Sequence, residues 1–136
     1  MDDLDLEDVK SLTNQLIEHV GEATWEEINL GTAGANYGWK RYEGPAVFDP
    51  NAPLNGAPSF PIHVYGHDDA GGRSVTGGYV YRGQSEGLHG QYFFGDFVRG
   101  NLWSFPISRI SLSRRSSRPS SMKMTNRTIG IRICSR

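Results

Sequence analysis

The apolar and polar positions of the first 104 residues form one helix-like stretch followed by several strand-like stretches. Between residues 5 and 20, apolar side chains recur every three or four positions, and three carboxylates lie in the first turn. Carboxylates at that end of a helix are favoured by its dipole. The pattern therefore predicts one amphipathic helix over 1–20, ended by Gly21.

Glycine and proline separate the strand-like stretches that follow. A short strand is predicted over 25–30, and GTAG at 31–34 forms a turn after it. The Pro-rich stretch 45–72 has no long periodic run. It is predicted to be mostly loop, with a brief extended piece at 60–65.

The clearest β pattern lies between residues 73 and 103. SVTGGYVYRG, QYFFGDFV and NLWSF are separated by short breaks that contain glycine, which predicts an antiparallel meander of three strands. Tyr79 and Tyr81 point to one face and Val80 to the other, so both faces carry apolar side chains. Such a sheet needs cover on both sides, and the radial stacking of a β-propeller supplies it.

Composition and charge further limit the classes of protein to which the chain can belong. The chain of 136 residues contains 17 Gly and 7 Pro, too many for a helical bundle. It has no run of 18 apolar residues, and its first 20 residues are acidic, so no membrane partner and no signal peptide are predicted. The single Cys134 cannot form an internal disulfide.

The net charge of −1 conceals a division near residue 104. Residues 1–104 carry 6 Lys/Arg and 15 Asp/Glu, a net of −9, while 105–136 carry 8 Lys/Arg and no carboxylate, a net of +8. The Arg/Ser-rich segment 105–136 is predicted to be a disordered tail, of the kind a frameshifted reading frame produces. Its charge alone could attract RNA, but it lacks aromatic residues for base stacking, so no specific nucleic-acid partner is predicted.

Several motifs in order carry a resemblance to a known family. TWEEINLGTAGANYGW, SVTGGYVYRG and YFFGDFVRGNLW make residues 21–104 resemble the C-terminal part of the soluble quinoprotein sugar dehydrogenases, the glucose/sorbosone dehydrogenases. The resemblance implies about two blades of a six-bladed β-propeller that binds pyrroloquinoline quinone (PQQ) and calcium. It also implies a periplasmic or extracellular protein whose parent reaction oxidises the C1 hydroxyl of an aldose sugar to a lactone, with hydride transfer to the quinone.

The same resemblance implies site residues. Glu27 and the carbonyl of Tyr37 correspond to ligands of a structural calcium, with Asp49 as a further ligand, and calcium prefers such oxygens. Gly21 matches the cofactor-binding loop, and Val98 stands where relatives carry a cofactor-binding lysine. Judged without the resemblance, Glu27 is interpreted instead as a solvated carboxylate beside Glu26, since carboxylates are mostly exposed.

The histidine that takes the substrate proton in the family has no counterpart here. None of the four histidines lies in its motif, and a quinone oxidation needs such a base. The chain is therefore predicted to be an inactive fragment of a sugar dehydrogenase-like enzyme. The alternative is a noncatalytic carbohydrate- or protein-binding module that resembles the Hedgehog-interacting proteins, which share the propeller.

The remaining groups of candidate residues point less clearly to a chemical function. His63 and His67 are four apart in an extended segment, which does not bring them together for a metal. His67, Asp68 and Asp69 form a polar loop tip, either solvated or at a substrate rim. Arg82 is interpreted as a charged strand end, with a place near a ligand as the alternative.

A fragment of a propeller leaves an apolar face and a strand edge uncovered. Self-association through these strands is therefore predicted. The residues expected to be exposed are Tyr79, Val80, Tyr81, Tyr92, Phe93, Phe94 and Phe97.

Overall fold

A computed structural model describes residues 16–108 and 110, and within these residues the chain is all-β. Two three-stranded antiparallel sheets have the strand orders β1-β2-β5 and β6-β7-β8, and a long excursion between β2 and β5 of the first sheet holds the small β3-β4 pair. The strands are β1 (Leu16–His19), β2 (Trp25–Leu30), β3 (Tyr42–Glu43), β4 (Ala46–Val47), β5 (His63–Gly66), β6 (Val75–Val80), β7 (Gln91–Asp96) and β8 (Leu102–Pro106). A 3-10 turn, η1 (Glu86–Leu88), lies between β6 and β7.

The prediction of an N-terminal helix is wrong for the last residues of the predicted range. Residues 16–19 form β1, which pairs antiparallel with β2 from Leu16 opposite Leu30 to His19 opposite Glu27. Pairing satisfies the backbone groups along the outer edge of β2, which a helix over these residues would leave without partners. The remainder of the predicted helix lies outside the described residues.

The strand predictions hold more closely elsewhere. β2 covers the six residues predicted as a strand, and β6, β7 and β8 form the predicted meander. In the GTAG turn, Ala35 N–H donates to the Thr32 carbonyl, and Gly34 has φ +75°, a conformation that glycine adopts without strain. The extended piece predicted over 60–65 begins and ends later, because β5 occupies His63–Gly66.

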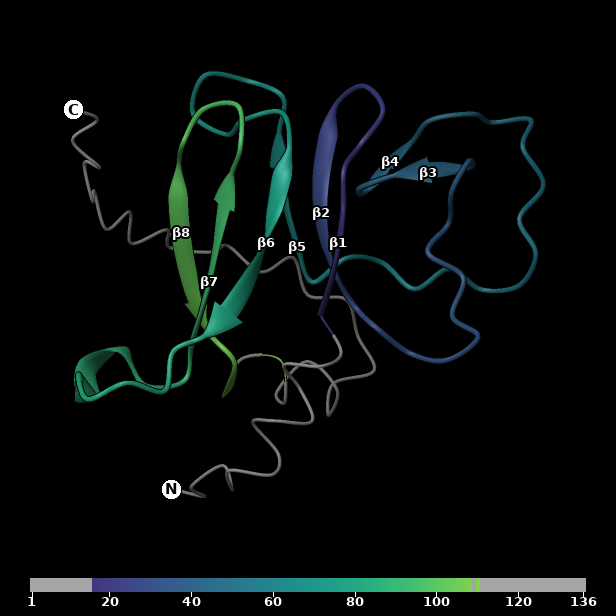
Figure 1. The fold of residues 1–136 in the computed structure, drawn as a ribbon. Helices are drawn as coiled ribbons and strands as arrows, with labels where there is room; N and C mark the ends of the chain where they lie inside the picture. Colours follow the sequence, from purple (N-terminus) through teal and green to yellow (C-terminus); the bar gives the residue numbers. More distant parts are fainter. Residues whose placement is uncertain (1–15, 109, 111–136) are drawn as a thin grey trace.

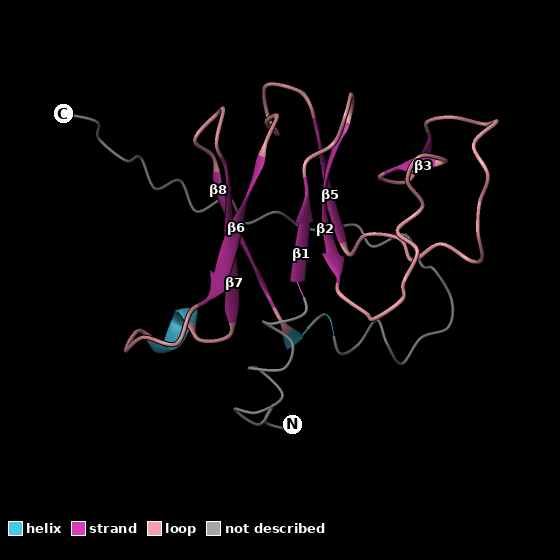
Figure 2. Cartoon of the chain, turned by 45° about the vertical axis from the view of Figure 1, so that its right-hand side comes forward, coloured by secondary structure: helices cyan, strands magenta, loops and turns pink. Residues whose placement is uncertain are grey.

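The two sheets stack face to face (Figure 1, Figure 2). From the first sheet, His63 lies 5.2 Å from the ring of Phe94, and Tyr65 lies 4.8 Å from that of Trp103. Ile28, on the same face as His63, is fully buried. The other face of this sheet is turned toward the β3-β4 segment, so the first sheet is covered on both sides.

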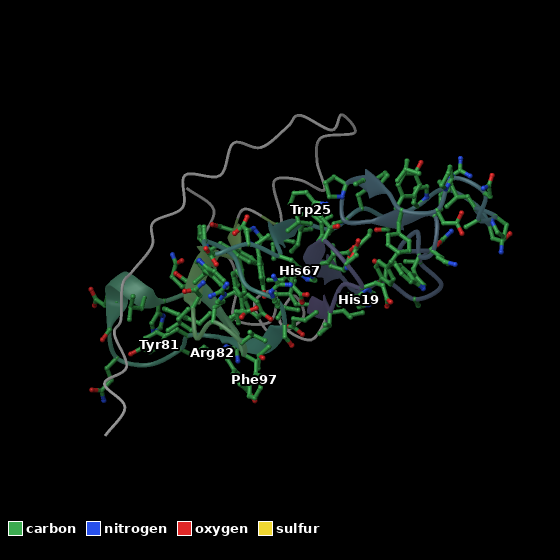
Figure 3. The ribbon with its side chains drawn as sticks, turned by 90° about the horizontal axis from the view of Figure 1, so that it is seen from above. His19, Trp25, His67, Tyr81, Arg82 and Phe97 are labelled. Carbon is green, nitrogen blue, oxygen red and sulfur yellow. The ribbon has the colours of Figure 1, made fainter. Side chains whose placement is uncertain are left out.

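This stacking corrects part of the exposure prediction. Val80, Tyr92 and Phe94 are buried at 6%, 1% and 2% exposure because they face the first sheet. Tyr79 and Phe97 are 81% and 82% exposed, and Phe97 projects outward from the second sheet in Figure 3. The uncovered surface is therefore the outer face of β6-β7-β8 and the β7-β8 turn.

The core also extends beyond the predicted boundary at residue 104. β8 ends at Pro106, and Phe105, Ile107 and Ile110 are buried with the core residues of both sheets. The residues predicted as a disordered tail therefore begin inside the packed core, while 111–136 lie outside the described residues. No helix among the described residues is long and apolar enough to cross a membrane.

Candidate functional site

A cavity of about 480 Å³ lies between the first sheet and the β3-β4 segment. β1 and the following turn supply Glu18, His19 and Gly21, and β2 supplies Glu27. The facing wall comes from residues 37–43, including three aromatic side chains. A pocket of this size with aromatic walls and a few polar groups is typical of ligand-binding sites.

Glu27 is held at the base of this cavity by two donors. Its Oε1 accepts a 2.5 Å hydrogen bond from Gly44 N–H, and its Oε2 accepts one of 2.9 Å from Asn29 Nδ2. His19 Nδ1 lies 3.9 Å from Oε2, and Glu27 is only 7% exposed. The carboxylate therefore connects β2 to the end of β3, and the solvated interpretation of Glu27 is wrong.

Glu43 fixes the opposite wall. Its Oε1 accepts hydrogen bonds from the N–H groups of Ala23, Thr24 and Trp25, at 2.7, 3.0 and 3.5 Å. Burial favours a higher pKa for Glu43, but these donors outweigh burial, so its pKa lies below the usual value. Glu43 is therefore ionised at neutral pH and accepts hydrogen bonds from its surroundings.

The aromatic wall is ordered by contacts on both sides. Tyr37 OH donates to the Leu30 carbonyl and accepts from Thr32 N–H, and its ring packs edge-on against His19 at 5.3 Å. The ring of Trp39 lies 5.1 Å from that of Phe48 and remains 56% exposed at the cavity. Fixed rings beside fixed carboxylates present a preformed surface to a ligand.

Three of the four predicted site residues line this cavity. Gly21, Glu27 and Tyr37 are among its lining residues, whereas Asp49 is not. Asp49 lies 3.5 Å from Lys40 Nζ and accepts from Asn51 N–H, and this N–H donor lowers the pKa of the Asp49 carboxyl. Within the described residues, no group of three or more His, Cys, Asp or Glu is placed to hold a metal.

Gly21 is placed by close packing. A Cβ at this position would lie 1.7 Å from the Trp25 carbonyl oxygen, so only glycine fits. Its N–H donates to Glu26 Oε1 at 3.2 Å. The glycine therefore lets the β1-β2 turn close over the cavity.

A second polar cluster, at the junction of the two sheets, was not predicted from the sequence. Glu26 is fully buried, with Oε1 2.6 Å from His67 Nε2 and Oε2 accepting from Val75 N–H at 2.7 Å. Asp96, 3% exposed, accepts from Tyr65 OH at 3.0 Å. The only sequence signal for this cluster is that these carboxylates lie inside predicted strands whose two faces are apolar.

The outcome for the remaining candidates is mixed. His63 lies in the aromatic core while His67 pairs with Glu26, so the two do not meet, as predicted. The solvated interpretation of the loop tip fails for His67, whose side chain is 10% exposed, and holds for Asp68 and Asp69. Arg82 follows β6 as an exposed residue (Figure 3), and Val98, 56% exposed, lies in the β7-β8 turn.

The fold and cavity define an all-β chain with two stacked antiparallel sheets and an acidic, aromatic-lined pocket. No protein-family model and no solved structure match the chain. It is similar to two curated relatives from Arabidopsis thaliana. The HIPL1 protein is 32% identical over 136 residues, which covers 84% of this chain and 20% of the relative. The HIPL2 protein is 37% identical over 100 residues, which covers 65% of this chain and 14% of the relative, so the chain spans at most a fifth of either.

Proposed function

We propose that this chain is a noncatalytic binding module of the β-propeller type, whose ligand surface is the cavity between β1-β2 and β3. The observation that carries the proposal is the cavity itself, where Glu27 and Glu43 are fixed by backbone donors beside Tyr37 and Trp39. Carboxylates held by N–H donors accept hydrogen bonds from a ligand, and the rings provide apolar contact area.

Two further findings support the propeller-type class. The chain resembles the HIPL1 and HIPL2 proteins, and neither printed name is that of a dehydrogenase. Its motifs also resemble the propeller shared by the sugar dehydrogenases and the Hedgehog-interacting proteins. Neighbouring propeller blades are likewise small antiparallel sheets that pack against one another, although a blade typically has four strands. By the same resemblance we propose an extracellular location.

One structural observation supports the proposal that calcium binds in this cavity. Asn29 Oδ1 is buried beside Glu27 and has no hydrogen-bond partner among the described residues. An amide oxygen, a carboxylate and the Tyr37 carbonyl are oxygen ligands of the kind calcium prefers. In the proposed site these groups would hold the ion, and the ion would tie β2 to the loop that carries Tyr37.

The described residues do not match the binding site that the quinone requires. Of the positions that the resemblance assigns to the cofactor, this chain matches only Gly21, and Val98 stands in place of the cofactor-binding lysine. No step of a quinone reaction is therefore part of the proposal.

A redox assay separates a binding module from an enzyme. The full chain is incubated with PQQ, calcium and glucose, and reduction of a redox dye is followed beside a known quinoprotein glucose dehydrogenase. We expect a rate equal to the blank without protein. Turnover that is abolished by replacing His19, His63, His67 or His89 would overturn the noncatalytic assignment.

A further inference from the structure

An exposed apolar surface borders the mouth of the cavity. Trp39, Val47 and Phe48, here named the apolar platform, are 56%, 54% and 36% exposed, and the rings of Trp39 and Phe48 lie 5.1 Å apart. Trp39 also lines the cavity, so platform and cavity form one continuous surface. Exposed apolar side chains gathered beside a pocket mark interaction sites more often than isolated ones do.

The charge of this region is one-sided. Residues 16–60 contain six carboxylates and only two basic side chains, Lys40 and Arg41, a net of −4. Lys40 Nζ pairs with Asp49, and Arg41 donates to the carbonyls of Pro50 and Ala52, away from the cavity lining. Among the described residues, the lining of the cavity therefore contains no lysine or arginine, and the imidazole of His19, 3.9 Å from Glu27, is its one basic side chain.

The carboxylates differ in what they can offer a ligand. Glu22, at the mouth, is exposed and makes no hydrogen bond or ion pair within the described residues. Deeper in, Glu43 uses only Oε1 for the three backbone donors. Behind Glu27, the buried acceptor Asn29 Oδ1 lacks a donor. Glu22 and the second oxygen of Glu43 can accept hydrogen bonds from N–H donors that also carry positive charge, whereas Asn29 is not among the lining residues.

We infer that the cavity receives a basic side chain, an arginine, from a protein partner whose neighbouring apolar residues pack on the platform. The inference rests on the proposed binding function and names its partner class. A planar guanidinium stacks on an indole ring such as Trp39 and donates in several directions to carboxylates. An anionic partner, such as a phosphate-rich surface, is repelled by the same charge.

Binding of two matched probes tests the charge of the ligand. The full chain, in EDTA so that calcium does not occupy the same oxygens, is titrated with Nα-acetyl-arginine amide and with the nearly isosteric, neutral Nα-acetyl-citrulline amide. Binding is followed by NMR shifts of the indole N–H groups. We expect saturable millimolar binding of the arginine amide and at least threefold weaker binding of the citrulline amide.

Two variants locate the site. Glu22→Gln removes a charge at the mouth from an exposed residue and is expected to weaken arginine amide binding about two- to fivefold. Glu86→Gln removes an exposed charge from η1, outside the cavity lining, and is expected to leave binding unchanged. Increasing the salt concentration should reduce the difference between the wild-type chain and Glu22→Gln.

Other results overturn the inference. Equal binding of the two probes, equal effects of the two variants, or no saturable binding of the arginine amide would each exclude recognition of a basic side chain. Binding of methyl glucoside in place of the arginine amide would leave the noncatalytic module standing and replace its ligand class. Quinone-dependent turnover would remove the proposed function itself.

Discussion

Replacing Asp96 by asparagine tests whether the junction between the sheets depends on a buried negative charge. Asp96 Oδ2 accepts from Arg73 N–H and Ser74 N–H at 2.7 Å each and from Tyr65 OH at 3.0 Å. Its Oδ1 accepts from Arg99 N–H at 2.7 Å. Asparagine keeps one oxygen for the first group of donors but turns an NH₂ toward Arg99 N–H, so one donor loses its acceptor.

The magnitude follows from these contacts. A hydrogen bond to a charged group contributes about 1.5–3 kcal/mol, and a buried donor left unsatisfied costs about 1–3 kcal/mol. Because the remaining bonds weaken but survive, we expect Asp96→Asn to lower the free energy of unfolding by about 2–4 kcal/mol. For a domain of this size, each kcal/mol corresponds to about 4–8 °C in Tm.

The pH dependence gives a second check on the same charge. Burial favours a higher pKa for Asp96, but the N–H donors of Ser74, Arg99 and Arg73 and the Tyr65 hydroxyl outweigh it, so its pKa lies below 3.8. The stabilisation is therefore complete above the unfolded-state pKa and is lost as pH falls through the lower folded-state value. The difference between wild type and Asp96→Asn should shrink below about pH 4.

Urea unfolding followed by tryptophan fluorescence measures this difference. The control is Asp69→Asn, which removes the ion pair between Arg99 and a side chain that is 94% exposed, and it should change the free energy of unfolding by less than about 1 kcal/mol. If Asp96→Asn is as stable as Asp69→Asn at pH 7, the charge does not hold the junction.

Three other measurements follow from the same structure. Burial lowers the pKa of the His63 imidazole below 6.5, so the free energy of unfolding falls as pH drops below 6.5. His63→Phe should flatten the dependence of this free energy on pH between pH 7 and 5, and parallel curves for the two proteins would contradict the prediction. Calcium should raise Tm by a few degrees, and Glu27→Gln should remove most of that increase; equal melting of both proteins with and without calcium would exclude the site. Self-association and apolar-dye binding, measured by sedimentation and fluorescence, should fall in the variant with Tyr79→Lys and Phe97→Lys, whereas a wild-type monomer that binds no dye would contradict the prediction.

Local patterns predicted the strands because their signals are short in range. β2 and the β6-β7-β8 meander combine β-branched and aromatic residues with glycine turns, and each of these signals lies within a few residues of the strand. β1 was missed because four residues cannot distinguish a helical from a strand period, and its conformation is decided by the edge of β2.

The site was only partly predictable for a different reason. The family resemblance named Gly21 for the cofactor loop and Glu27, Tyr37 and Asp49 for calcium; in the structure the first three line one cavity and Asp49 does not. The buried roles of Glu26 and Asp96 depend on partners far along the chain, 49 residues away for Val75 N–H. Spacing within a sequence contains no information about such contacts.

The acceptors at the sheet junction recognise main-chain N–H groups. Glu26 binds the N–H of Val75, and Asp96 binds those of Arg73 and Ser74. Every amino acid except proline carries that donor, so these hydrogen bonds do not depend on which side chains occupy 73 and 74, whereas Val75 also packs its side chain in the core. Substitutions at 73 and 74 can therefore accumulate without loss of these hydrogen bonds, whereas a proline at either position would remove one donor to Asp96.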